Sequence, residues 1–108
     1  MKSLALYRGP NGDPSVDVQL LGNGDLRLLS IQRQGVWVYS DIDTIAWWSW
    51  YTVSRADLTR LTGEGGDVLE TVRAAVAPED DGVVKRFQAW LAERGVTAAW
   101  NSYDEREA

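Results

Sequence analysis

The chain of 108 residues contains no cysteine and no histidine. Without cysteine it has no disulfides, thiolate nucleophiles or thiolate zinc sites. Without histidine it lacks the commonest general base and the commonest nitrogen ligand of metals. Carboxylates, tyrosines, hydroxyls and two lysines remain, and neither Lys2 nor Lys85 lies in a motif typical of serine–lysine hydrolases. We therefore expect a protein that is not an enzyme and that uses no cofactor or metal.

Positive charge and long apolar runs are also scarce. The chain has 16 acidic and 11 basic residues, which gives a formal net charge of −5. This average field repels nucleic acid. The segment before Arg8 has only a short apolar patch, too short for a signal peptide or a membrane span. We expect a cytoplasmic protein that binds neither nucleic acid nor a membrane directly.

The first half of the chain carries strand signals. Apolar and β-branched runs predict strands at residues 2–7, 16–21, 26–31, 36–40 and 44–53.

The connection between the second and third of these strands contains an Asn-Gly pair at residues 23–24, which predicts a two-residue type I′ turn. Such a turn would set the register of the hairpin. It would place Val18 opposite Leu29 and Val16 opposite Ile31 on the buried side.

The second half carries helix signals. Ser54 has the place of an N-cap for a short helix that ends near Leu61, and Asp67 has that place for a second helix that Pro78 ends. A third helix is predicted over 83–94, followed by a strand over 96–100 and a frayed charged tail over 104–108. The expected fold is a single α+β domain over residues 1–108. We expect an antiparallel meander of about four or five strands, with two or three helices on one face.

Two acidic groups are candidate binding sites. Asp41 and Asp43 lie two residues apart, so that both point to the same side of an extended chain just before an aromatic strand. The same pair is also a good turn sequence, which is the favoured interpretation. The run 79–81, Glu-Asp-Asp, offers oxygen ligands, but acids placed before a helix more often stabilise its positive end.

The segment Thr44–Val53 contains three tryptophans and is the most unusual feature of the sequence. Its alternation places Trp47 and Tyr51 on one face of the sheet and Trp48 and Trp50 on the other. We expect the first pair to lie in the core. The second pair is either core as well or part of an exposed aromatic patch. The candidate partner-binding residues are Trp37, Tyr39, Asp41, Asp43, Trp48, Trp50, Glu79, Asp80 and Asp81.

The run 51–61 (YTVSRADLTRL), followed by 87–96 (FQAWLAERGV) and Trp100, resembles small bacterial immunity proteins of polymorphic toxin systems. The resemblance covers the C-terminal half of the chain. It implies a protein that binds and neutralises a cognate toxin by covering the active site of that toxin. The acidic charge suits a basic toxin, for example a nuclease.

Three alternatives remain open from the sequence. The first is a carbohydrate- or small-ligand-binding module that uses Trp48 and Trp50 as stacking platforms beside Asp41 and Asp43. The second is a hydrolase that depends on those two carboxylates alone. The third is a nucleic-acid mimic, which requires the acidic side chains to form rows on the surface.

Overall fold

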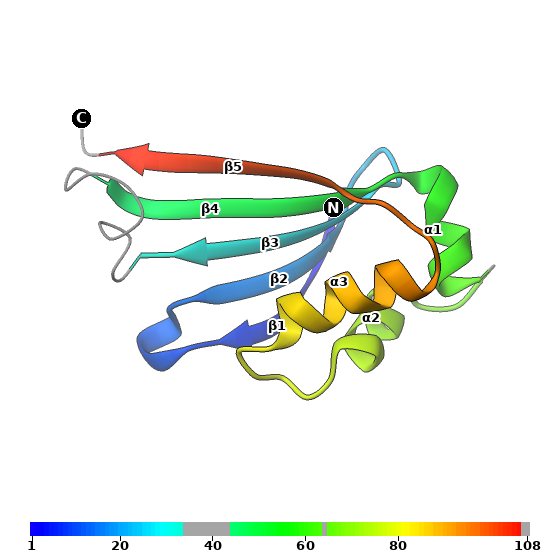
Figure 1. Cartoon of the computed structure of the whole chain (residues 1–108), viewed down its shortest axis with the longest axis horizontal. Coiled ribbons are helices and arrows are strands. Elements are labelled where there is room, and N and C mark those ends of the chain that lie inside the picture. Colours follow the sequence, from blue (N-terminus) through cyan, green and yellow to red (C-terminus); the bar gives the residue numbers. More distant parts are fainter. Residues whose placement is uncertain (34–43, 64, 107–108) are drawn as a thin grey trace.

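The computed structural model describes residues 1–33, 44–63 and 65–106. Its central element is a five-stranded antiparallel sheet in which the strands are neighbours in chain order (Figure 1). The fold is α+β, as the sequence predicted. The strand predicted over 36–40 lies outside the described residues. The strands are β1 (Lys2–Arg8), β2 (Ser15–Leu20), β3 (Leu26–Gln32), β4 (Thr44–Val53) and β5 (Ala99–Arg106).

Three α-helices connect β4 to β5, namely α1 (Arg55–Thr62), α2 (Val68–Val76) and α3 (Val83–Glu93). A short 3-10 helix, η1 (Pro10–Gly12), lies between β1 and β2. The predicted N-caps are confirmed. The Ser54 hydroxyl accepts the Asp57 backbone N–H, and the Asp67 carboxylate accepts that of Glu70. These bonds satisfy N–H groups that lack partners in the first turn of a helix.

The helices cover one face of the sheet, on the side of β1 and β2, while β3, β4 and β5 extend past them (Figure 1). Leu6, Val18 and Leu28 of the sheet share the buried core with Val72 and Phe87 of the helices. Each of these five side chains is at most 1 % exposed. We call this side of the sheet the covered face. The burial of its aliphatic side chains is the main force that holds the helices on the sheet.

The β2–β3 hairpin has the predicted strands but a different register. Val18 pairs with Leu28 rather than Leu29, and Val16 pairs with Ser30 rather than Ile31. The loop has three residues, 22–24, closed by a bond from the Leu21 N–H to the Asp25 carbonyl. A type I′ turn needs positive φ at both central residues, but of these three described residues only Gly24 has it. The predicted register is therefore wrong by one residue.

The shift moves Leu29 and Ile31 to the other face of the sheet, because a slip of one residue exchanges the two sides of a strand. Leu29 pairs with Asp17 on one side and with Trp50 on the other. Leu29 and Ile31 therefore form an apolar strip on β3, beside Trp50 and Trp48 of β4.

The C-terminal strand is longer than the sequence predicted. A strand was predicted over 96–100 and a frayed tail over 104–108, but β5 continues through Arg106, with Asp104 opposite Trp47 and Arg106 opposite Thr44. The prediction of fraying is thus corrected for residues 104–106, which the ladder to β4 holds in place. β5 is an edge strand of the sheet.

Candidate functional site: an aromatic depression on the open face of the sheet

The second face of the sheet carries no helix among the elements that the structure describes (Figure 1). We call it the open face. Its side chains follow from the strand registers, since alternate residues of each strand point to the same side. They include Asp17, Gln19, Arg27, Leu29, Ile31, Trp48, Trp50, Asn101 and Tyr103.

A depression of about 210 Å³ lies on the open face. We call it the aromatic depression. Neighbouring strands bring its side chains together: β3 provides Arg27 and Leu29, β4 provides Trp48 and Trp50, and β5 provides Tyr103. Trp48 stands directly opposite Tyr103 in the β4–β5 ladder.

The side chains of the depression differ in exposure. Leu29 is only 9 % exposed, whereas Tyr103 is 55 % exposed. Trp48 and Trp50 are half-buried. The indole Nε1 of Trp48 is screened from solvent and has no hydrogen-bond acceptor in the described part of the chain. The two tryptophans therefore form neither a closed core nor a freely solvated surface. They present ring area next to an apolar floor.

Arg27 is the charged residue of the depression. Its Nε donates to the Gln19 Oε1 at 2.7 Å, and Gln19 is only 7 % exposed. Among the residues that the structure describes, no carboxylate forms an ion pair with Arg27. The guanidinium is thus fixed at one nitrogen, and its two terminal nitrogens are left for another acceptor.

The other charges of the open face lie outside the depression. Arg8 forms an ion pair with Asp17 at 2.7 Å, which neutralises both. Glu105 lies two residues beyond Tyr103 along β5 and is not one of the residues that line the depression. No acidic side chain of the described residues lines the aromatic depression.

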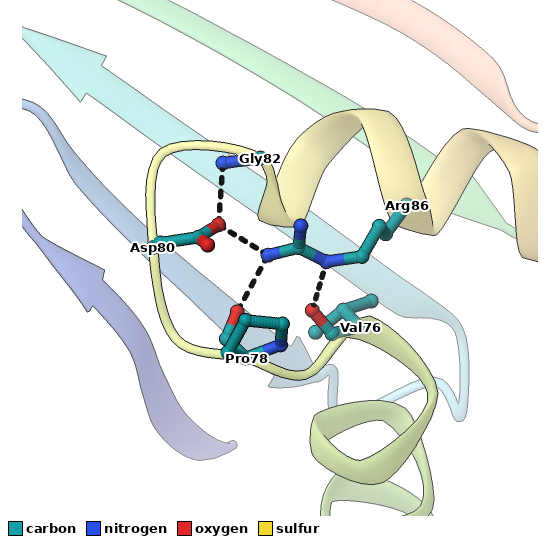
Figure 2. Close-up of polar contacts among 5 residues, drawn as sticks. All are labelled: Val76, Pro78, Asp80, Gly82 and Arg86. Carbon is teal, nitrogen blue, oxygen red and sulfur yellow. Dashed lines mark hydrogen bonds and ion pairs between the residues drawn. The ribbon is translucent and has the colours of Figure 1, made fainter.

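The predicted acidic run 79–81 lies in the loop between α2 and α3, in the helical layer. Figure 2 shows that Arg86 of α3 points into this loop. Its guanidinium donates to the Val76 carbonyl at 2.7 Å, to the Pro78 carbonyl and to the Asp80 carboxylate. The same carboxylate accepts the Gly82 backbone N–H at 2.8 Å. We call this set of bonds the Arg86 clamp.

The Arg86 clamp gives the acidic loop a structural role. The bonds from Arg86 and then from the Gly82 N–H hold the pKa of Asp80 below its ordinary value. Glu79 forms an ion pair with Arg73 of α2 at 3.2 Å, while Asp81 is exposed. These contacts join the end of α2 to the start of α3. They do not bring the run 79–81 to the aromatic depression.

Four other predicted binding residues lie outside the described residues, namely Trp37, Tyr39, Asp41 and Asp43. Trp47 was expected in the core, but it is only half-buried and does not belong to the core cluster. It pairs with Gln32 and Asp104, near the strand ends that extend past the helices, so the helices do not cover it.

Tyr51 packs against the core as expected. Its ring is 6.5 Å from that of Phe87, and its hydroxyl accepts a bond from the Gln88 Nε2 at 2.7 Å. The prediction for the covered face of β4 thus holds near the helices and fails farther along the strand.

Sequence reasoning missed three residues of the depression, namely Arg27, Leu29 and Tyr103. The hairpin register concealed the first two, because the predicted turn placed Leu29 on the buried side. Tyr103 lay in the segment next to the expected tail. Tyr103 lies opposite Trp48, and Asn101 lies opposite Trp50. This pairing indicates that Tyr103 shares the face of the two tryptophans, but it follows only once β5 is known to pair with β4.

The described residues contain no group of three or more carboxylates that could hold a metal ion. Within the same residues, none of the helices is long and apolar enough to cross a membrane. The aromatic depression offers aromatic rings for stacking and one guanidinium. No protein-family model, curated protein or solved structure matches this chain.

Proposed function

We propose that this chain is a non-catalytic protein-binding domain that docks its partner on the open face of the sheet. The observation that carries the proposal is the gathering of Trp48, Trp50 and Tyr103 on a face that none of the described helices covers. Large aromatic side chains are typical anchors of protein interfaces, since each can bury on the order of 150–250 Å².

The finer proposal is that the partner is a toxin and that this chain is its immunity or inhibitor protein. The resemblance of the C-terminal half to immunity proteins supports it. The net charge of −5 also supports it, because an acidic chain attracts a basic toxin from a distance. In this proposal long-range attraction comes from the whole acidic chain, and the short-range anchors are the aromatic side chains of the open face.

The test is a calorimetric titration of the protein with the toxin domain encoded by the neighbouring gene. We expect a complex that Tyr103→Ala weakens by at least about fivefold, since truncation of an interface anchor often costs more than 1 kcal/mol. Trp100→Ala is the matched control. Trp100 lies on the same strand and is 53 % exposed against 55 % for Tyr103, but it points to the covered side, opposite Tyr51.

The two parts of the proposal fail in different ways. Absence of any binding by the unchanged protein would contradict the toxin partner. Binding that is weakened by Trp100→Ala and not by Tyr103→Ala would contradict the open face as the docking surface.

A carbohydrate- or small-ligand-binding module is the second candidate function. The aromatic depression favours it, because sugar rings stack on aromatic faces that have polar groups beside them. The measurement is tryptophan fluorescence during titration with a panel of oligosaccharides. A response that Trp50→Ala abolishes is expected for this candidate, and a uniform lack of response removes it.

A further inference from the structure

We infer that the aromatic depression binds a carboxylate attached to an apolar group, and that the Arg27 guanidinium is the counter-ion of this carboxylate. The inference rests on the proposed function, because it assigns a ligand chemistry to the same open face. It goes beyond that function by naming which group of the partner enters the depression.

The first argument is the state of Arg27. Its Nε is held by Gln19 at 2.7 Å, so that the side chain is oriented before any ligand arrives. Its planar guanidinium has further donors that fit the two oxygens of a carboxylate. Across residues 1–33, 44–63 and 65–106, no acidic side chain forms an ion pair with it. Nearby Asp17 is already bound to Arg8 at 2.7 Å.

The second argument is the apolar environment. Leu29, Trp48, Trp50 and Tyr103 line the depression with Arg27. Apolar walls lower the effective dielectric around the guanidinium and strengthen its attraction to an anion. The same walls offer contact area to an apolar group beside the carboxylate. A ligand with both features uses the whole depression, whereas a bare inorganic anion uses only Arg27.

Trp48, which also lines the depression, carries one further donor. The Trp48 Nε1 has no acceptor within the described residues. A buried donor without an acceptor is unfavourable, so a hydrogen bond to it from a ligand oxygen would stabilise the complex. A carboxylate supplies hydrogen-bond acceptors, while an ammonium group supplies none and is repelled by Arg27.

The test uses two pairs of small probes that differ only in charge. N-acetyl-phenylalanine is compared with its neutral amide, and the peptide acetyl-Phe-Glu-amide is compared with acetyl-Phe-Gln-amide. The readout is the set of indole N–H signals in NMR spectra of the ¹⁵N-labelled protein. We expect the charged probe of at least one pair to bind about two- to fivefold more tightly than its neutral match, the range expected for a partly exposed ion pair.

The responding signals identify the site. Trp48 and Trp50 should shift, while Trp90, which is 7 % exposed in the core, should not. A preference within the first pair indicates a free acid or a chain terminus as the ligand, and a preference within the second pair indicates an acidic side chain. Equal binding of the charged and neutral probes in both pairs would overturn the inference, and this comparison needs no variant.

Two arginine variants localise the charge preference. Arg27→Gln should abolish it and leave the stacking contribution, so that both probes of a pair bind alike. Arg60→Gln is the matched control, since Arg60 is an exposed residue of α1 and does not line the depression, and it should retain the preference. A preference that survives Arg27→Gln would contradict the assignment of the counter-ion.

The same variants separate this inference from the proposed function. If the toxin complex is weakened by Tyr103→Ala but unchanged by Arg27→Gln, and the probes show no charge preference, the docking surface stands and the carboxylate inference fails. If the probes show the preference but no toxin binds, the ligand chemistry stands and the proposed partner fails.

Discussion

The two faces of the sheet use the same five strands for different purposes. On the covered face, Val18, Leu28 and Val53 are fully or almost fully buried under the helices. On the open face, Trp50 is half-buried and Tyr103 is exposed, although both have larger side chains. Trp50 and Tyr103 would contribute more to stability if they were covered. Their position on the open face supports the proposal that this face binds a partner.

This comparison makes its strongest prediction for stability. Phe87→Ala, which truncates a fully buried ring of α3 in the core beneath the covered face, should lower the free energy of unfolding by about 3–5 kcal/mol. Tyr103→Ala should lower it by less than about 1 kcal/mol, because the ring is already half in water. Denaturant unfolding of the two variants measures both values. Equal losses would mean that the two faces do not differ as described.

A smaller loss is expected when the helical layer is loosened through its polar contacts. Arg86→Ala removes the Arg86 clamp and leaves the Val76 and Pro78 carbonyls without this donor. The free energy of unfolding should fall by about 1–3 kcal/mol, the range for a lost set of partly buried hydrogen bonds. Lys85→Ala is the control, since Lys85 is an exposed neighbour on α3 and should change stability little. A similar loss in both variants would argue against the clamp.

The smallest effect concerns pH. Because the folded protein lowers the pKa of Asp80, ionised Asp80 stabilises the fold above the ordinary carboxyl pKa of 3.8, and this contribution disappears as the pH falls through the lowered value. The stability difference between the unchanged protein and Asp80→Asn should therefore shrink between about pH 7 and about pH 2. Asp81→Asn is the matched control at an exposed neighbouring carboxylate. A difference that stays constant over this range would contradict the role given to Asp80.

Much of the fold is encoded in local sequence. β4 has its predicted bounds, because a continuous run of aromatic and β-branched residues between polar ends is a strong strand signal. The helices begin where Ser54 and Asp67 predicted, because each cap is decided by bonds within a few residues.

The residues of the candidate site depend on the register of the β2–β3 hairpin and on the pairing of β5 with β4, and local sequence decides neither. An Asn-Gly pair fits both a two-residue turn and the three-residue loop observed, and the choice between them determines which face receives Leu29. Tyr103 meets Trp48 only because β5 pairs with β4 after three intervening helices. The sequence therefore indicated the aromatic strand as the candidate site but not the residues Arg27, Leu29 and Tyr103 on the neighbouring strands.

The central claim is that the partner binds the open face, and hydroxyl-radical footprinting of the complex with the cognate toxin domain tests it most directly. Oxidation rates are compared between the free and the bound protein for Trp48, Trp50, Tyr103 and Trp100. We predict that binding lowers the rates of the three open-face residues and leaves that of Trp100 unchanged. Protection of Trp100 with no protection of the open-face rings would contradict the claim.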